Sequence, residues 1–267
     1  MRYFDTHTHS EFSPDSVMKM EKAAALCLEK GLSGLVFTDH MDIDTPTGVE
    51  SFMFDPGAQQ TEAERVSREY KVELLKGIEL GLQPRTVEKS RERLKVFSFD
   101  TVILSVHFVD GKDPYHQPRF FEDKDYIKAY GRYLETILDC MTKYVDFDIL
   151  GHYDYITRYA PYRERSLRYR DFPDLLDSIL SYLATNGKAL EINTNTYRSK
   201  YKGATAPDPD IFKRFRELKG EFISLGSDAH GADRICENFD LFGEFAKNCG
   251  FRYLTLFRGR KASLSAI

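Results

Sequence analysis

The sequence predicts an α/β protein in which parallel strands alternate with covering helices to form a barrel. Short apolar runs alternate with longer segments of helical periodicity about seven or eight times from end to end. The chain of 267 residues contains no Ser/Gly-rich linker and no low-complexity stretch, and this length is usual for one barrel. We therefore expect residues 1–267 to form a single domain whose core needs no disulfide bonds.

The expected strands are short, mostly apolar runs, as is typical of strands buried in a parallel sheet. They cover residues 2–5, 34–38, 73–80, 101–106, 147–150, 188–192, 221–225 and 253–257. The expected helices have apolar residues at helical spacing, and they cover residues 16–30, 59–70, 84–96, 124–144, 172–186, 208–218 and 238–248. Gly31 and Gly187 stand where a glycine commonly ends a helix. Residues 41–56 and 157–171 are the longest irregular segments, and such loops are often functional.

Composition and charge are those of an ordinary globular protein. The formal net charge is −4, and because nucleic-acid-binding surfaces usually show a basic excess, we expect no nucleic-acid partner.

The N-terminal residues lead into Asp5 without the apolar stretch of a targeting segment, so we expect a cytoplasmic protein without a membrane association. The four cysteines form no Cys-x-x-Cys pair and are expected to be small buried side chains. The sequence does not predict an oligomeric state.

The histidines are distributed unevenly with respect to the expected strands. Six of the seven lie at or just beyond the C-terminal end of a strand, namely His7, His9, His40, His107, His152 and His230, whereas His116 lies within a loop. Glu79 and Asp228 share this placement. Because the C-terminal ends of parallel barrel strands face the same end, these side chains should converge. Histidine and carboxylate bind zinc, iron and manganese, and burying so many together would be costly without cations. The sequence therefore predicts a metal site at this end.

Seven motifs carry a resemblance to a known family: DTHTHSEFSPDS at residues 5–16, TDH at 38–40, IELG at 78–81, SVH at 105–107, GHYDY at 151–155, EINT at 191–194 and GSDAH at 226–230. With these motifs the sequence resembles the PHP family, named for polymerase and histidinol phosphatase. They span nearly the whole chain in the family order. In length, and in the segments GHYDYITRY and EINTNTYR, the chain is most similar to the stand-alone histidinol-phosphate phosphatases.

This resemblance implies a distorted (β/α)7 barrel that holds three divalent metal ions, which could be zinc, iron or manganese. Carried over by position, the first metal would be held by His7, His9, Glu79 and Asp228. Glu79 would bridge to a second metal that is also held by His107 and His152. The third metal would be held by Asp15, His40 and His230, although Asp15 could instead be the N-cap of the following helix.

Three further carboxylates lie next to the expected ligands. Asp5 and Asp39 either orient the ligands that follow them or are ordinary polar residues at strand ends. Glu191 is expected to support the site without binding a metal.

The implied activity is that of a histidinol-phosphatase, which hydrolyses L-histidinol phosphate to L-histidinol and phosphate in histidine biosynthesis. The expected catalytic residues are Glu79, His107 and Asp228, with attack by a hydroxide that bridges the first two metals. The chain lacks the Cys-x5-Arg and DxDx[TV] motifs of phosphatases that form a phospho-enzyme, which makes a covalent intermediate less favoured.

The expected partner is a small phosphorylated substrate. Arg158 and Arg198 match family positions that contact substrate, and arginine binds phosphate bidentately. Residues 157–171 carry four more arginines that could cover the site but are mostly expected to face solvent. The acidic partner of a substrate amine stays open among Glu11, Asp42 and Asp44, and the general acid is not identified.

Two other functions fit the same motifs. The chain could be a PHP phosphoesterase that acts on another small phosphate, a nucleotide or a nucleic-acid end. It could also be a non-catalytic interaction module that metal ions stabilise. The module is less favoured, because its ligand set is often incomplete and here all nine positions are filled.

Overall fold

The computed structural model describes residues 3–45, 52–115, 118–201 and 206–267. In these residues, seven parallel strands lie side by side in the order β1-β2-β4-β5-β6-β7-β8, and a short β3 pairs with β4. The strands are β1 (Phe4–Thr8), β2 (Gly34–Phe37), β3 (His40–Asp42), β4 (Glu73–Gly81), β5 (Thr101–Ser105), β6 (Ile149–Leu150), β7 (Ala189–Asn193) and β8 (Ile223–Gly226). Parallel order along the chain is the arrangement that strand–helix alternation predicts.

The sheet curls until its two edge strands meet. The chain that leaves β8 runs beside β1, where the backbone N–H of Asp228 donates to the oxygen of His7 at 2.8 Å and that of His9 donates to the oxygen of Ala229 at 2.9 Å. A parallel bridge joins Thr8 to Ala229. The strands therefore form a nearly closed seven-stranded parallel barrel, which confirms the predicted fold class.

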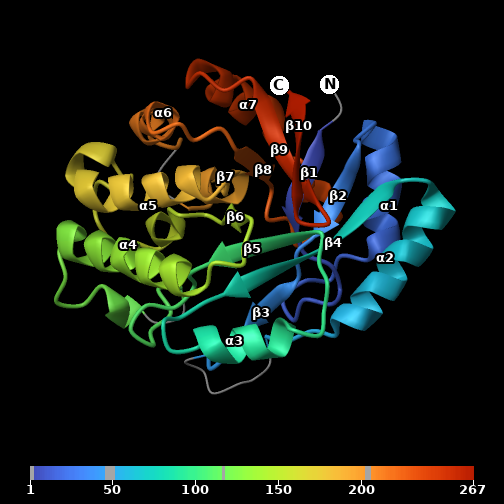
Figure 1. Ribbon diagram of the computed structural model, residues 1–267, viewed down its shortest axis with the longest axis horizontal. Helices are drawn as coiled ribbons and strands as arrows, with labels where there is room; N and C mark the ends of the chain where they lie inside the picture. The colour runs from blue at the N-terminus through green and yellow to red at the C-terminus, as the bar shows by residue number, and fades with distance from the viewer. Residues whose placement is uncertain (1–2, 46–51, 116–117, 202–205) are drawn as a thin grey trace.

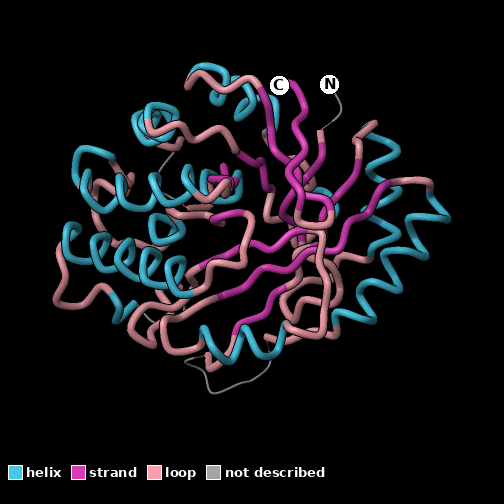
Figure 2. Tube along the Cα trace, viewed as in Figure 1, coloured by secondary structure: helices cyan, strands magenta, loops and turns pink. Residues whose placement is uncertain are grey.

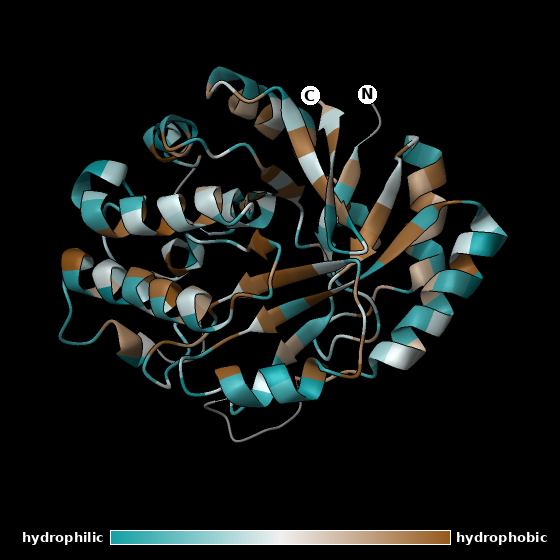
Figure 3. Cartoon of the chain, viewed as in Figure 1, coloured by the Kyte–Doolittle hydropathy of each residue, from teal (hydrophilic) through white to brown (hydrophobic). Residues whose placement is uncertain are grey.

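Helices surround the strands, as Figures 1 and 2 show. They are α1 (Met20–Lys30), α2 (Pro56–Tyr70), α3 (Val87–Leu94), α4 (Tyr126–Lys143), α5 (Pro173–Thr185), α6 (Pro209–Glu217) and α7 (Phe239–Asn248). The strands are mostly hydrophobic, whereas α2 and α3 are largely hydrophilic (Figure 3). The main core lies between strands and helices, where Tyr130, Phe147 and Phe212 are fully buried. This packing fixes the strand ends that carry the site.

Several element ends differ from the sequence prediction. The first strand extends to Thr8, so His7 lies within it. The first helix begins at Met20 instead of residue 16, because Ser16 donates through its backbone to Ser13 and through its hydroxyl to the oxygen of His9. The third helix begins at Val87 instead of residue 84. As predicted, Gly31 ends α1 in the left-handed conformation, with φ of 64°.

Two short elements were not predicted. β3 begins at His40 and runs into the expected loop of residues 41–56, and a hairpin of β9 (Tyr253–Arg258) and β10 (Lys261–Ala266) extends the expected last strand. The cysteines are free, as expected, and three of the four are buried. Among the described helices, none has the length and apolar character needed to cross a bilayer. His116 and residues 46–51 of the first long loop lie outside the described residues.

Candidate metal centre

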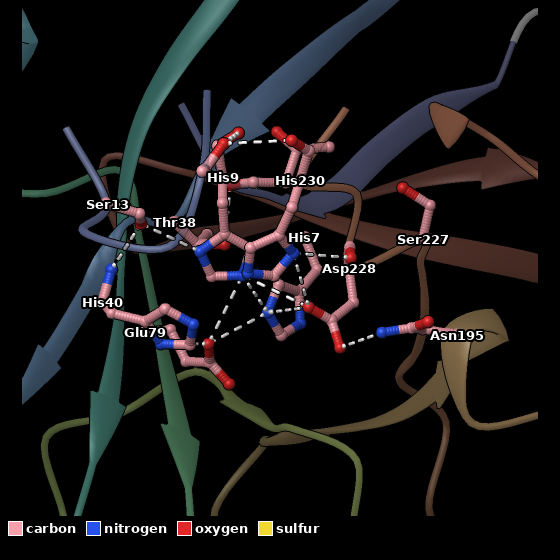
Figure 4. Close-up of polar contacts among 12 residues, drawn as sticks. His7, His9, Ser13, Thr38, His40, Glu79, Asn195, Ser227, Asp228 and His230 are labelled. Carbon is pink, nitrogen blue, oxygen red and sulfur yellow. Dashed lines mark hydrogen bonds and ion pairs between the residues drawn. The ribbon is translucent and has the colours of Figure 1, made fainter. Parts of the chain in front are cut away.

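The C-terminal ends of the strands bring together the histidines and carboxylates that the sequence singled out. His7 belongs to β1, His40 to β3 and Glu79 to β4, while His107 and His152 follow β5 and β6 by two residues. Asp228 and His230 follow β8. Figure 4 shows four of the histidine rings gathered around Glu79 and Asp228. The predicted convergence of these side chains at one end of the barrel is therefore confirmed.

Glu79 lies at the centre of this cluster, and it is fully buried. Its Oε2 is 3.3 Å from Nε2 of His7 and 3.4 Å from Nε2 of His9. Its Oε1 is 3.2 Å from Nε2 of His107 and 2.7 Å from Nε2 of His152. One carboxylate thus presents a different oxygen to each of two histidine pairs, which is the geometry of a bridging ligand.

A third group of side chains lies beside the first. Oδ2 of Asp15 is 3.5 Å from Nε2 of His40 and 3.2 Å from Nε2 of His230. The ring of His9 stacks on both of these histidines, with centroid distances of 4.2 and 4.1 Å. The helix-cap alternative for Asp15 is wrong, because α1 begins five residues later at Met20. Asp15 instead points its carboxylate at two histidines.

Hydrogen bonds to Nδ1 set the orientation of four histidine rings. Nδ1 of His7 lies 2.7 Å from Oε1 of Glu191, and Nδ1 of His107 lies 2.9 Å from Oδ1 of Asp42. In His9 it lies 3.2 Å from the hydroxyl of Ser13, and in His230 it lies 3.1 Å from the backbone oxygen of Asp228. A ring that donates through Nδ1 presents the lone pair of Nε2 to the cluster.

The arrangement fits divalent cations. The Nε2 atoms of His7 and His9 are 3.2 Å apart, and those of His107 and His152 are 3.4 Å apart. Two lone pairs at such distances repel unless a proton or a cation lies between them. Oε2 of Glu79 is buried and makes no hydrogen bond among the described residues, although Nδ1 of His40, which also makes none, lies 2.9 Å from it. A mixed set of imidazole nitrogens and carboxylate oxygens is what zinc, iron and manganese bind.

Burial and neighbouring charges shift the pKa values of these groups strongly. Burial, together with His230 and His40, lowers the pKa of His9 to about 3. Burial also opposes a charge on His7, but Glu191 and Glu79 outweigh it and hold its pKa well above the usual value. For Glu79 burial favours the neutral acid, yet the neighbouring histidines outweigh it and hold its pKa well below the usual range. The central carboxylate is therefore ionised and available to a cation.

Three carboxylates outside the predicted ligand set brace the cluster. Glu191 accepts from the backbone N–H of His152 at 2.6 Å through Oε2, in addition to its contact with His7. Asp39 accepts from the hydroxyl of Ser13 at 2.9 Å, and Ser13 contacts His9. Asp5 accepts from two backbone N–H groups in the segment after β8, and burial raises its pKa to about 6. Each of the three thus holds part of the site in place.

Close packing at the end of β8 also depends on one glycine. A Cβ on Gly226 would lie 2.2 Å from Oε1 of Glu191 and 2.5 Å from Cβ of His7. Two residues later Asp228 has a φ of 52°, a left-handed conformation that is uncommon outside glycine and that often marks a functional site. The motif GSDAH therefore combines a residue without a side chain with an aspartate in a strained backbone conformation.

A cavity of about 730 Å³ opens above the cluster. Arg158 lines it and is buried; its Nη2 donates to Oδ2 of Asp228 at 3.1 Å and to Oδ1 of Asn193 at 3.0 Å. Arg198 lines the same cavity, where its Nε is 3.7 Å from Oε2 of Glu237. The structure thus places both predicted arginines beside the cluster.

Of the three acidic residues considered for a substrate amine, one lines the cavity. Asp42 does so while accepting from His107. Glu11 instead accepts from the backbone N–H of Met20, and Asp44 pairs with Lys89 at the surface. The four additional arginines of the loop 157–171 do not line the cavity. Arg234 and Lys200 do, and sequence reasoning missed both because nothing local to either residue marks it.

Comparison with known proteins places the chain in a family. Residues 5–195 match the family described as PHP domain. A probable histidinol-phosphatase of Clostridium acetobutylicum is 33% identical over 93% of this chain and 94% of its own. The histidinol-phosphatase of Lactococcus lactis is 32% identical over 98% of this chain and 96% of its own.

The solved structures agree with these matches. A crystal structure of the Lactococcus lactis histidinol phosphate phosphatase, complexed with zinc, L-histidinol and phosphate, superimposes with a TM-score of 0.88. It is 30% identical, and the match covers 98% of this chain and 99% of that one. The chain belongs to the PHP family.

Proposed function

We propose that this chain is a metal-dependent phosphatase that hydrolyses L-histidinol phosphate to L-histidinol and phosphate. The observation that carries the proposal is the position of Glu79, whose two oxygens face two separate pairs of Nε2 atoms. Relatives of nearly the same length are named histidinol-phosphatases, and one of them was crystallised with zinc, L-histidinol and phosphate. A cavity of about 730 Å³ suits a small phosphate ester.

Three metal ions would be held by the nine side chains of the cluster. The first would take His7, His9, Glu79 and Asp228, since Oδ1 of Asp228 is 3.3 Å from Nε2 of His9. The second would take Glu79, His107 and His152. The third would take Asp15, His40 and His230. Divalent cations in such sites lower the pKa of bound water and neutralise phosphoryl oxygens.

The protein side chains supply orientation and charge. We expect three residues to be essential to catalysis. Glu79 links two groups of the cluster, and His107 and Asp228 lie where the cluster meets the cavity. Arg158 is a donor for phosphoryl oxygens, and its guanidinium is already held by Asn193 and Thr196. A preorganised donor of this kind stabilises developing charge without reorganising during the reaction.

Phosphate release from a panel of esters tests this function. The panel contains L-histidinol phosphate, 4-nitrophenyl phosphate, a nucleoside monophosphate and a 3′-phosphorylated oligonucleotide, each assayed with Mn²⁺ or Zn²⁺. We expect histidinol phosphate to be strongly preferred and its turnover to be abolished by Glu79→Gln. Exposed Glu29 supplies the matched control, Glu29→Gln, which should leave turnover unchanged.

The same panel separates the alternatives. Metal-dependent turnover of other esters, with none of histidinol phosphate, would keep a PHP phosphoesterase but reject the substrate. No turnover by a metal-loaded protein would reject the phosphatase and favour the interaction module.

A further inference from the structure

Arg234 is a cation in the cavity wall that neither the motifs nor the proposed ligand set includes. It ends the short helix η5 (Ala232–Arg234), and its backbone N–H donates to the oxygen of Gly231 at 3.0 Å. This turn follows His230 directly and brings the guanidinium into the cavity that His230 and Asp15 also line. The side chain is 14% exposed, so most of it is withdrawn from solvent.

The guanidinium of Arg234 is buried with fewer acceptors than donors, because Nε faces no acceptor among the described residues and Nη2 faces only the carboxylate of Glu237. Its Nε and Nη2 are buried, and neither makes a hydrogen bond within the described part of the chain. Nη2 contacts Oε2 of Glu237 as an ion pair, but that oxygen also remains without a hydrogen bond there. Arg158 differs, because its Nε and Nη2 both donate to protein oxygens. Buried donors that lack a protein acceptor are expected to receive one from a ligand or from water.

The local charge indicates what kind of acceptor this is. Oε2 of Glu237 faces both Arg234 and Arg198, so one carboxylate offsets two guanidinium groups. Lys200 lines the same cavity and adds a further positive charge. The carboxylates Asp15, Asp42 and Asp228, which also line the cavity, face histidines of the cluster. The guanidinium donors of the wall therefore favour an oxyanion, and arginine is well suited to phosphate.

We propose that Arg234 binds the phosphate group of the substrate by donating to a phosphoryl oxygen, and that Glu237 positions its guanidinium. The assignment rests on the proposed function only in that the cavity binds a phosphate ester. It does not depend on which alcohol the ester carries. Arg158 and Arg234 then contact the phosphate as two separate cations.

Binding of inorganic phosphate to the metal-loaded full chain tests the proposal. Isothermal titration is carried out on the wild type, Arg234→Gln, Arg234→Lys and Arg163→Gln, with bound metal measured in every sample. Loss of a charge-assisted hydrogen bond should weaken phosphate binding about 10- to 100-fold in Arg234→Gln. Arg234→Lys keeps the charge and should lose about 10-fold or less. Arg163 is exposed and outside the cavity, so Arg163→Gln controls for net charge and should bind as the wild type does.

Kinetics supply a second readout. The KM of Arg234→Gln should rise by the same factor for histidinol phosphate and for 4-nitrophenyl phosphate, because the phosphate group is common to both. Phosphate binding by Arg234→Gln within twofold of the wild type would overturn the proposal. Weaker binding that accompanies loss of metal would also overturn it, since Arg234 would then act through the cluster.

The outcomes for this inference and for the proposed function can be told apart. If the wild type hydrolyses no ester and yet binds phosphate through Arg234, the inference stands and the proposed function fails. If histidinol phosphate is hydrolysed and Arg234→Gln binds phosphate as the wild type does, the proposed function stands and the inference fails.

Discussion

Replacement of Glu191 by glutamine should weaken metal binding although Glu191 is not one of the proposed ligands. Oε1 accepts from Nδ1 of His7 at 2.7 Å, and Oε2 accepts from the backbone N–H of His152 at 2.6 Å. Glutamine has one acceptor where the carboxylate has two. Its amide group must therefore face either the N–H of His152, a donor, or Nδ1 of His7, which would move the proton of that ring to Nε2 inside the cluster.

Either orientation of the glutamine amide has a cost in free energy or in metal affinity that can be estimated. Leaving a buried donor unsatisfied costs about 1–3 kcal/mol, and loss of a carboxylate that orients a metal-binding histidine typically lowers metal affinity about 10- to 100-fold. We expect Glu191→Gln to lose zinc affinity within that range while the fold is retained. Competition with a chromophoric chelator measures the affinity, and circular dichroism monitors the fold.

Glu29→Gln provides the matched control for that measurement, because Glu29 is exposed on α1. Zinc affinity of Glu191→Gln within twofold of the control would refute the reasoning, since His7 would then not need its carboxylate partner.

Three other substitutions test separate parts of the structure. Asp42→Asn should weaken metal binding about 10-fold or more, because Asp42 holds Nδ1 of His107, and the chelator assay would show no change if that contact is irrelevant. Asp55→Ala removes the N-cap of α2 and should lower the free energy of unfolding by about 1 kcal/mol in urea without changing activity; an unchanged midpoint would contradict this. Burial raises the pKa of Asp154 from 3.8 to about 6, so its contribution to stability should fall as pH rises through that window, by about 3 kcal/mol at most. Asp154→Asn should remove this part of the decline, whereas the part that Asp5 contributes remains, because burial also raises the pKa of Asp5 to about 6. Equal pH dependence in both proteins would argue against the role of Asp154.

The sequence predicts the C-terminal ends of the strands after the first to within about one residue, because period and burial are local properties. Runs such as residues 34–38 and 101–106 are apolar throughout, and both became buried parallel strands. Once these strands are assigned, the histidines that follow them must lie at the same end of the barrel, since parallel strands share that end. This is why the convergence of the cluster could be predicted without coordinates.

Features that depend on distant partners could not be predicted in the same way. Asp42 is 65 positions from His107, and only the folded chain shows that it accepts from that ring. β3 is three residues long and has no apolar run, so no periodicity marks it. The start of α1 shifted because Ser16 bonds to the oxygens of His9 and His230, contacts that local propensity does not contain.

Metal dependence of histidinol phosphate hydrolysis tests the central claim most directly. The chain is stripped with a chelator, and phosphate release is then measured as Zn²⁺ or Mn²⁺ is added back, with bound metal counted in the same samples. We expect no activity in the stripped protein and recovery that levels off at about three bound ions, with Glu79→Gln failing to recover at any metal concentration. Undiminished hydrolysis by the stripped protein, or full recovery in Glu79→Gln, would contradict a reaction built on this cluster.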